Sequence, residues 1–235
     1  IIDQINNADR NGIREVVLTG TQLGNYGFDL DKITLKSLLR KVIKETNIER
    51  IRVSSLQPKE IDEELINIWK YESDNRLCPH FHLPLQSGSN NILKKMRRRY
   101  SSKEFIDITK MINENMPEAS ITTDVIVGFP SETEGEFNET LEVIEESYLN
   151  NLHVFPYSSR PKTSAYYSKK HINAEIIKFR SKELVELSNY ISGISKKKIV
   201  GKKRSVLWEG KDKTSGLTED YYRVLRKYSD KPDTE

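Results

Sequence analysis

The stretch HFHLPLQSGSNNILKKMRRRY, residues 80–100, contains a strand-like run, a polar corner and a basic helix-like segment in direct succession. At its start His80, His82 and Gln86 alternate with apolar residues, so the two kinds of side chain point to opposite faces of a strand. The corner Gln-Ser-Gly-Ser, residues 86–89, suits neither a strand interior nor a helix interior. We therefore expect the chain to turn here from a two-faced strand into a helix.

Similar runs recur along the first two thirds of the chain. Strands are expected at REVVLTG, RIRVSS, HFHLPL, ITTDVIVGF and NLHVFPYS. Helical patterns separate these runs; in one of them Phe137, Leu141, Ile144 and Tyr148 recur at the spacing of one helix face. Alternating strands and helices up to about residue 160 predict an α/β fold, with a parallel sheet and crossover helices in either an open sheet or a barrel.

Strand after strand has one apolar face and one face with charged or hydrogen-bonding groups. Besides the three residues named above, the polar faces contain Arg52, Ser54, Thr122, Asp124, His153, Phe155 and Tyr157. The apolar faces can pack on helices, and a barrel interior is the simplest place for the polar faces. An eight-stranded barrel is usually filled with branched aliphatic side chains. We therefore expect a partial (β/α)6-type barrel whose polar lumen holds a ligand. Because an unpaired buried charge is costly, Arg52 and Asp124 are predicted to meet there.

The last third of the chain has a different pattern. A long helix is expected over about residues 172–198, with Ile177, Leu184 and Leu187 on one stripe. Short β-rich pieces separated by glycine-containing turns follow it, as in a small β domain. The predicted organisation is a partial barrel over residues 1–171, a helix and linker over 172–200, and an incomplete small β domain over 201–235.

Composition limits the possible partners. The 38 Lys and Arg residues nearly balance 35 Asp and Glu residues, so nucleic acid could be attracted only by local patches. A single cysteine, Cys78, excludes an internal disulfide or a thiolate metal site made by this chain alone and indicates a reducing, cytoplasmic setting. No run has the length of a membrane span, and no signal segment opens the chain. Because the chain begins at Ile1 within a helical pattern, we expect an upstream part to be absent.

Five loops at the expected strand ends combine small residues with hydrogen-bonding side chains. They span residues 19–27, 54–58, 86–89, 128–133 and 157–161. Ordinary turns explain any single one, but ligands of α/β folds bind where strands end, so five together favour a ligand site. No phosphate-binding loop, nucleophile elbow or catalytic triad is present. His80 and His82 lack a third ligand and are better explained as core residues than as a metal site.

Two basic clusters stand out. The first contains Lys94, Lys95, Arg97, Arg98 and Arg99. The second contains Lys202, Lys203 and Arg204, preceded by Lys196–Lys198, and adjoins a β segment with Trp208, Tyr221 and Tyr222. A solvated helix face is the ordinary explanation for such runs, whereas cations beside aromatic side chains on a small β fold also suit RNA.

Six blocks in order resemble the radical S-adenosylmethionine methylthiotransferase family. They are VVLTGTQLGNYG, RIRVSSLQP, HLPLQSGSNNILKKMRRRYS, TTDVIVGFPSETEGEF, FPYSSRPKTSAY and VLWEGKDKTSGLTEDYYRV, the last similar to the start of a TRAM domain. The blocks VSSLQP and LTGTQLGNYG look most like the branch that acts on N6-threonylcarbamoyladenosine at position 37 of tRNA. The resemblance implies a transferase that adds a methylthio group at C2 of that base.

The resemblance also implies cofactors and partners. Members of the family cleave S-adenosylmethionine reductively at one [4Fe-4S] cluster, form a 5′-deoxyadenosyl radical, and transfer sulfur from a second cluster. Their cysteine ligands, a C-x-x-x-C-x-x-C loop and three further cysteines, have no counterpart here, so this chain alone is expected to be inactive. The implied partners are the anticodon stem-loop of tRNA and an electron donor, with no membrane and no DNA.

The resemblance and the polar strand faces indicate the same cofactor walls. Thr19, Gly20 and Gln22 correspond to contacts with the methionine end of the cofactor. Ser54, Gln86 and Ser87 are expected to bond its carboxylate or ribose, with Asp124 nearby. The adenine is expected between Gly128, Phe129, Phe155 and Tyr157. The two basic clusters are the expected RNA contacts.

Three alternatives remain open from the sequence. The substrate could be isopentenyl-adenosine tRNA, or a ribosomal protein side chain. The chain could also be a non-catalytic RNA-binding protein with an empty barrel.

Overall fold

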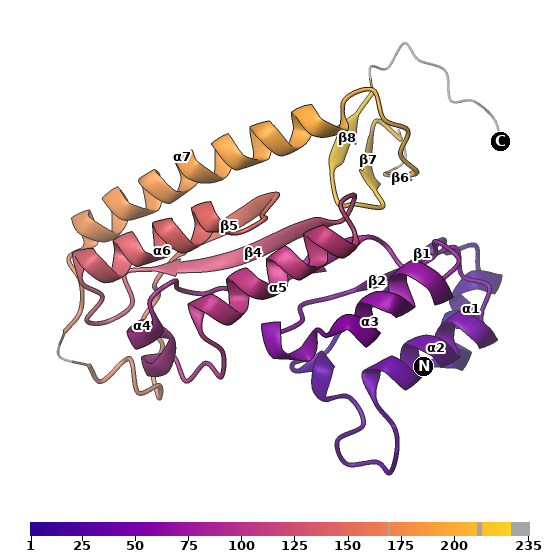
Figure 1. Ribbon diagram of the computed structural model, residues 1–235, viewed down its shortest axis with the longest axis horizontal. Coiled ribbons are helices and arrows are strands. Elements are labelled where there is room, and N and C mark those ends of the chain that lie inside the picture. The colour runs from indigo at the N-terminus through magenta and orange to yellow at the C-terminus, as the bar shows by residue number, and fades with distance from the viewer. Residues whose placement is uncertain (169, 211–212, 227–235) are drawn as a thin grey trace.

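Five parallel strands follow one another in chain order (Figure 1). In the computed structural model, which describes residues 1–168, 170–210 and 213–226, they are β1 (Glu15–Leu18), β2 (Arg50–Val53), β3 (His80–His82), β4 (Ser120–Val127) and β5 (Asn151–Pro156). β1 pairs with β2, and β3–β4–β5 form a second parallel set. A short parallel bridge from Ile51 to Leu77 joins the two sets. The predicted α/β class and all five predicted strands are confirmed.

Helices connect the strands, as the alternating pattern predicted. They are α1 (Ile2–Arg10), α2 (Leu35–Glu45), α3 (Glu63–Asn67), α4 (Asn90–Lys95), α5 (Ser102–Asn115), α6 (Glu134–Glu146) and α7 (Ala174–Ile199), with short turns η1 (Leu23–Asn25), η2 (Pro58–Glu60) and η3 (Ile68–Glu72). Side chains of Thr34, Ser101 and Thr133 cap α2, α5 and α6. Tyr148, predicted on the α6 face, lies beyond the end of that helix. Among the described residues, no helix could cross a membrane.

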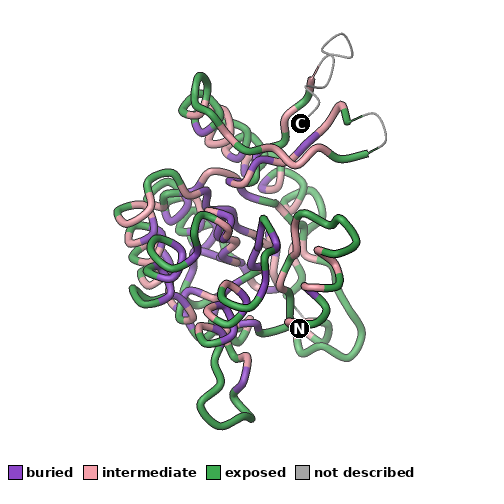
Figure 2. Tube along the Cα trace, turned by 90° about the vertical axis from the view of Figure 1, so that its right-hand side faces the viewer, coloured by how far each residue is buried: buried purple, intermediate pink, exposed green. Residues whose placement is uncertain are grey.

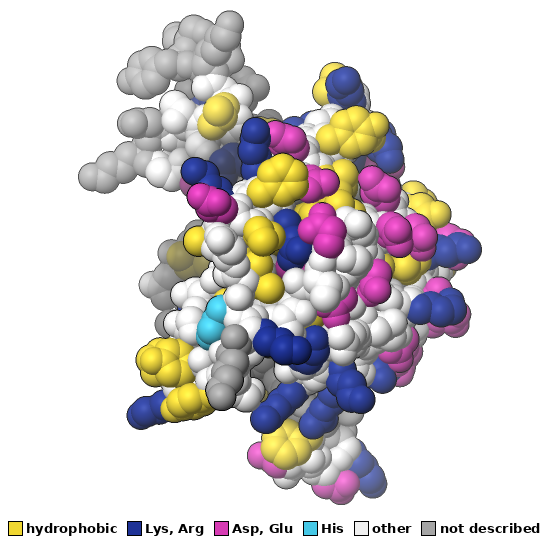
Figure 3. All heavy atoms as spheres, turned by 90° about the vertical axis from the view of Figure 1, so that its left-hand side faces the viewer, with side chains coloured by type: hydrophobic (Ala, Val, Ile, Leu, Met, Phe, Trp, Pro, Cys, Tyr) yellow, Lys and Arg dark blue, Asp and Glu magenta, His cyan; other side chains and the backbone are white. Residues whose placement is uncertain are grey.

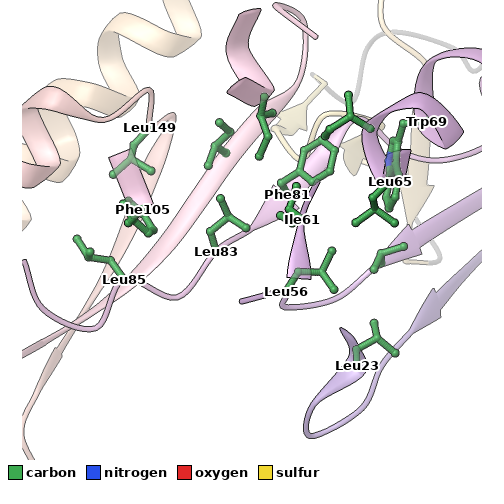
Figure 4. Close-up of a cluster of buried hydrophobic side chains, with 14 of the residues drawn as sticks. Leu23, Leu56, Ile61, Leu65, Trp69, Phe81, Leu83, Leu85, Phe105 and Leu149 are labelled. Atoms are coloured by element: carbon green, nitrogen blue, oxygen red, sulfur yellow. The ribbon is translucent and has the colours of Figure 1, made fainter. Parts of the chain in front are cut away.

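The apolar strand faces form the core beneath these helices (Figures 2 and 4). Ile51, Leu83 and Leu85 are fully buried, and Phe81 and Val125 are almost so. The rings of Phe81 and Trp69, from β3 and η3, lie 5.1 Å apart. Burying one such side chain stabilises the fold by about 1.5–3 kcal/mol, so these faces fix the strand orientation and send the polar faces inward.

The predicted contact between Arg52 and Asp124 is wrong. Arg52 Nε lies 3.2 Å from Glu15 on β1, whereas Asp124 lies 3.2 Å from His82 Nε2 on β3. The strands are staggered: the bridge to Leu77 places Arg52 beside residue 78, while the pairing of β3 with β4 places Asp124 beside residue 84. Six residues at about 3.3 Å each separate the two levels, so each charge takes a nearer partner.

A small antiparallel sheet follows α7 (Figure 1). It contains β6 (Val206–Glu209), β7 (Ser215–Thr218) and β8 (Arg223–Leu225). The guanidinium of Arg50 donates to the carbonyl of Leu217 at 3.2 Å, so this sheet packs at the amino ends of the barrel strands. α7 packs on the barrel, where Ser188 Oγ donates to the Leu152 carbonyl at 2.8 Å. The predicted division at residues 171 and 200 stays a prediction, and residues 211–212 and 227–235 of the predicted small domain lie outside the described residues.

Candidate functional site

A chain of hydrogen bonds runs along the lumen-facing side of β3 and β4. Thr122 Oγ1 lies 2.9 Å from His80 Nε2 and 2.9 Å from His82 Nδ1. His82 Nε2 continues to Asp124 Oδ2 at 3.2 Å, and the His153 ring lies 6.1 Å from that of His82. Burial, and secondly the charge of Arg52, holds the pKa of His80 well below its usual 6.5. The lumen is therefore polar, as the strand pattern predicted, and His80 is neutral at neutral pH.

Gln86 occupies the point where this polar face reaches the carboxyl ends of the strands. Its φ is +65°, a left-handed conformation that only a few per cent of non-glycine residues adopt. The backbone is held by hydrogen bonds to the Asp124 carbonyl at 2.8 Å and from the Ile126 N–H at 2.9 Å. The residue is 7% exposed, and among the described residues its side-chain amide has no hydrogen-bond partner. The amide is therefore available to a ligand.

A cavity of about 570 Å³ opens beside the ends of β4 and β5. Ile126, Phe129 and Tyr157 form part of its wall, with the two aromatic rings edge to face at 5.5 Å. The hydroxyl of Tyr157 is buried without a hydrogen-bond partner among the described residues. A buried hydroxyl in this condition is costly, so it is a suitable partner for a bound polar group.

The same cavity has a strongly basic lining, and we call it the basic cavity. Its cationic residues are Lys95, Arg97, Arg98, Arg160 and Lys162. None of the described residues that line it is Asp or Glu. Figure 3 shows Lys and Arg side chains gathered on the end of the molecule that contains α4. The cations come from two segments that lie far apart in the sequence, the end of α4 and the loop after β5.

Two of these cations lie in backbone conformations that favour glycine. Arg97 has φ +59° directly after α4, where the N–H of Arg98 bonds the Leu93 carbonyl at 2.9 Å, as in a Schellman motif. Lys162 has φ +70° after Pro161, in the position that glycine usually takes in a type II turn. For a residue with a Cβ the left-handed conformation costs roughly 1–2 kcal/mol. The basic cavity is thus built at some expense of backbone stability.

The predicted cofactor residues fall into two groups along the strand ends. Gln86, Asp124, Phe129 and Tyr157 lie around the lumen and the basic cavity, and Phe155, half exposed, pairs with Ile126 in the β4–β5 register. Thr19, Gly20 and Gln22 are exposed after β1, and Ser54 follows β2 and bonds the Leu18 carbonyl through its N–H at 2.9 Å. The structure brings the first group together, whereas the second lies on the other half of the sheet.

The Ser87 side chain faces outer helix α6, contrary to its predicted place in the cofactor wall, and the Cα of Gly128 packs against α7, while the predicted backbone contact of Gly128 with the adenine stays a prediction. The hydroxyl of Ser87 is fully buried, accepts from the Ser89 N–H at 3.2 Å and lies 3.4 Å from that of Thr140 on α6. The N–H of Gly128 donates to Glu132 at 2.9 Å, and a Cβ on this glycine would lie 2.4 Å from Ile177 of α7. Both residues pack against helices, because beyond the end of each strand the chain no longer directs them toward the lumen.

The first basic cluster is divided by the geometry. Lys95, Arg97 and Arg98 line the basic cavity, whereas Lys94 and Arg99 are exposed outside its lining. The sequence interpretation missed Arg160 and Lys162. The Arg-Pro-Lys triplet at a strand end, with a lysine where the turn favours glycine, was the available signal.

The second basic cluster lies at the opposite end of the strands. Lys202 Nζ pairs with Glu118 at 3.0 Å, and Arg204 Nε pairs with Asp220 at 2.6 Å. Hydrogen bonds from Lys202 and Arg204 hold the pKa of Glu118 below its usual value. Lys203 is exposed. These cations stabilise the position of the small sheet, and their predicted RNA contacts stay a prediction.

Candidate metal ligands lie apart from one another in the part of the chain that the structure describes. Cys78 is the only cysteine of the sequence and is 2% exposed, and burial raises the pKa of its thiol. Within the described residues, no three His, Cys, Asp or Glu side chains are placed to hold a metal ion.

Comparison with known proteins gives one family and two kinds of relative. The profile of the Radical SAM superfamily matches residues 1–144. A threonylcarbamoyladenosine tRNA methylthiotransferase, MtaB of Aquifex aeolicus, is 42% identical over 96% of this chain and 54% of its own length. A tRNA-2-methylthio-N(6)-dimethylallyladenosine synthase of Acetivibrio thermocellus is 37% identical over 92% of this chain and 45% of its own. The chain spans about half the length of these relatives.

Solved structures support the fold. Coproporphyrinogen III oxidase (HemN) of Escherichia coli, a radical SAM enzyme, superposes with a TM-score of 0.59 over 81% of this chain and 46% of its own, at 15% identity. The radical S-adenosylmethionine methyltransferase TsrM of Kitasatospora setae gives 0.52 over 66% of this chain and 29% of its own, also at 15% identity.

Proposed function

Because the chain belongs to the radical SAM superfamily, we propose that this protein inserts a methylthio group at C2 of N6-threonylcarbamoyladenosine at position 37 of tRNA. The observation that supports this most directly is the 42% identity to a methylthiotransferase named for that nucleoside, over nearly the whole chain. The expected partners are the anticodon stem-loop and an electron donor, in the cytoplasm. The chain covers about half of that relative, so the activity proposed is that of the whole protein.

S-adenosylmethionine fits the residues at the carboxyl ends of β3, β4 and β5. Its nucleoside part needs a flat apolar surface with hydrogen-bonding groups beside it, and Phe129 and Tyr157 offer ring surface next to the unpartnered Tyr157 hydroxyl. The free amide of Gln86 can bond a ribose hydroxyl or a carboxylate. When bound, this cofactor supplies the hydrogen-abstracting and methyl-donating chemistry. The described residues contain no ligand set for the iron–sulfur clusters.

The hydrogen-bonded row of His80, Thr122, His82 and Asp124 would position a bound substrate and would not itself react. His82 is held by Thr122 and lies 3.2 Å from Asp124, so it fixes the Asp124 carboxylate toward the carboxyl ends of the strands. In this position Asp124 can accept a hydrogen bond from a hydroxyl or amino group of a bound nucleoside. The buried wall of apolar side chains behind the strands keeps water from the other side of the sheet.

Deleting the gene and analysing tRNA nucleosides by mass spectrometry tests the function. We expect 2-methylthio-N6-threonylcarbamoyladenosine to disappear and to return with the intact gene. A gene encoding Gln86→Ala should restore it poorly, whereas the exposed substitution Gln4→Ala should restore it fully. An unchanged level of this nucleoside in the deletion strain would contradict the proposal. Loss of the dimethylallyl derivative instead would assign the substrate named for the second relative.

A further inference from the structure

We infer that the basic cavity recognises a carboxylate on the N6 substituent of the substrate adenosine, an inference that rests on the proposed function. The residues that carry it are Arg97 and Lys162, with Arg98 and Arg160 beside them. They come from the end of α4 and from the loop after β5, so the ligand would be held between two segments that the strands bring together.

The charge of the basic cavity requires a counter-charge. Five cations line it, and none of the described lining residues is acidic. Among the described residues, close side-chain partners are found for Lys95 alone, Ser131 Oγ at 2.8 Å and Glu136 at 3.8 Å. Arg98 Nε is buried without a hydrogen-bond partner among the described residues. Lys95, Arg97, Arg160 and Lys162 are exposed to solvent. Like charges gathered on one open surface repel one another and add to its positive potential, so the cavity attracts an anionic group.

The backbone gives independent support. Arg97 and Lys162 adopt φ values of +59° and +70°, in a helix cap and a turn where glycine is the usual residue. Glycine at either position would relieve strain and leave the local hydrogen bonds unchanged. Residues that keep an unfavourable backbone conformation are often found at functional sites, and here two cations of one cavity do so.

The two kinds of relative name two substituents of different chemistry. A threonylcarbamoyl group has a carboxylate, whereas a dimethylallyl group is a hydrocarbon. Guanidinium and ammonium groups form charge-assisted hydrogen bonds with a carboxylate. A hydrocarbon would remove water from the cations and replace none of its hydrogen bonds. The cavity volume of about 570 Å³ lies within the range of roughly 300–1,000 Å³ typical of small-molecule sites.

Nucleoside binding to the purified protein provides the test. The probes are N6-threonylcarbamoyladenosine, its methyl ester, in which a neutral ester replaces the carboxylate, and N6-dimethylallyladenosine. We expect the free acid to bind about 10-fold to 100-fold more tightly than the ester, as for a hydrogen bond to a charged group. Arg97→Gly and Lys162→Gly should each lower this preference about tenfold. Equal binding of acid and ester to the unaltered protein would overturn the inference.

Stability measurements separate a binding role from a folding defect. Lys32 is exposed and has φ +57°, so Lys32→Gly removes a cation from the same conformation away from the basic cavity. All three glycine variants should raise the thermal midpoint, by about 2–4 °C each. Only Arg97→Gly and Lys162→Gly should lose the preference for the free acid. Loss of that preference by Lys32→Gly as well would overturn the inference.

Two further pairs of probes test whether the cavity binds the cofactor or phosphates instead. S-adenosylhomocysteine has the amino-acid carboxylate of the cofactor, and methylthioadenosine lacks it. If Arg97→Gly and Lys162→Gly weaken only S-adenosylhomocysteine, the cavity serves the cofactor and the inference fails. If they weaken an unmodified anticodon stem-loop as much as a threonylcarbamoylated one, it serves phosphates and the inference also fails.

The carboxylate assignment and the proposed function are tested by different measurements. Nucleoside affinity is measured without turnover, while the function is tested by the methylthio nucleoside in tRNA. A preference for the free acid without loss of that nucleoside in the deletion strain rejects the function alone. Loss of the nucleoside without any preference rejects the carboxylate assignment alone.

Discussion

The ring of Tyr221 stacks on the imidazole of His80, with 4.1 Å between ring centres and 2° between planes. Tyr221 lies in the turn between β7 and β8, and the guanidinium carbon of Arg52 lies 5.1 Å from the centre of its ring. The guanidinium also donates to the carbonyls of Thr218 and Glu219. The small sheet therefore closes the amino end of the lumen, opposite the basic cavity.

Removing the Tyr221 ring should loosen the small sheet. Tyr221→Ala deletes both the stack on His80 and the cation–π contact with Arg52, so we expect a loss of about 1–3 kcal/mol in the free energy of unfolding. Hydrogen exchange should increase in β7 and β8. Tyr167→Ala, at a site 71% exposed, is the control and should change neither quantity appreciably. Unaltered exchange of β7 in Tyr221→Ala would show that the stack does not hold the sheet.

Stability should decline in mild acid because of His80. Its pKa in the folded protein lies well below the usual 6.5, mainly through burial and then through Arg52. Between these two values the unfolded chain binds a proton that the folded protein does not. The free energy of unfolding should therefore fall as the pH drops from about 7 to about 5, by up to about 1.4 kcal/mol per pH unit from this group.

Urea unfolding at several pH values checks this expectation. His80→Gln should flatten the decline, whereas His171→Gln, at an exposed histidine, should leave it unchanged. If the decline persists in His80→Gln, other groups are responsible for it.

Replacing the buried carboxylate of Glu15 should strongly lower the stability of the protein. Its carboxylate lies 2.9 Å from Arg50 Nε and 3.2 Å from Arg52 Nε, and the three side chains are at most 10% exposed. Glu15→Gln leaves two buried guanidiniums without their counter-charge, so we expect a loss of about 3–5 kcal/mol in chemical denaturation. Glu49→Gln removes an exposed partner of Arg14 and should cost less than about 1 kcal/mol. Similar losses in the two variants would contradict this assignment.

Two glycine substitutions should have opposite effects. Gly128 has φ +78°, and its Cβ would meet Ile177 at 2.4 Å, so Gly128→Ala should cost about 2–4 kcal/mol. Gly135 lies in α6 with no atom within 4 Å of an added Cβ, so Gly135→Ala should stabilise the helix by about 0.5–1 kcal/mol. Thermal unfolding measures both. A neutral Gly128→Ala would mean that α7 can move away from β4.

Alternation along the strands allowed much of the site to be predicted. His80, His82, Thr122 and Asp124 were expected on one face, and they form one hydrogen-bonded row. The contact of Arg52 with Glu15 could not be predicted, because alternation gives the facing of a side chain but not the stagger between strands. Ser87 was misplaced for a related reason: beyond the last strand residue the alternation no longer applies.

The sequence by itself determined the order of strands and helices and the apolar and polar face of each strand. These follow from local periodicity and residue types, which each segment has before it folds. Only the tertiary structure decided that Arg97 and Lys162 share one cavity, and that Tyr221 stacks on His80. Such contacts join segments separated by tens of residues, and their geometry depends on strand stagger and backbone conformations that no single segment specifies.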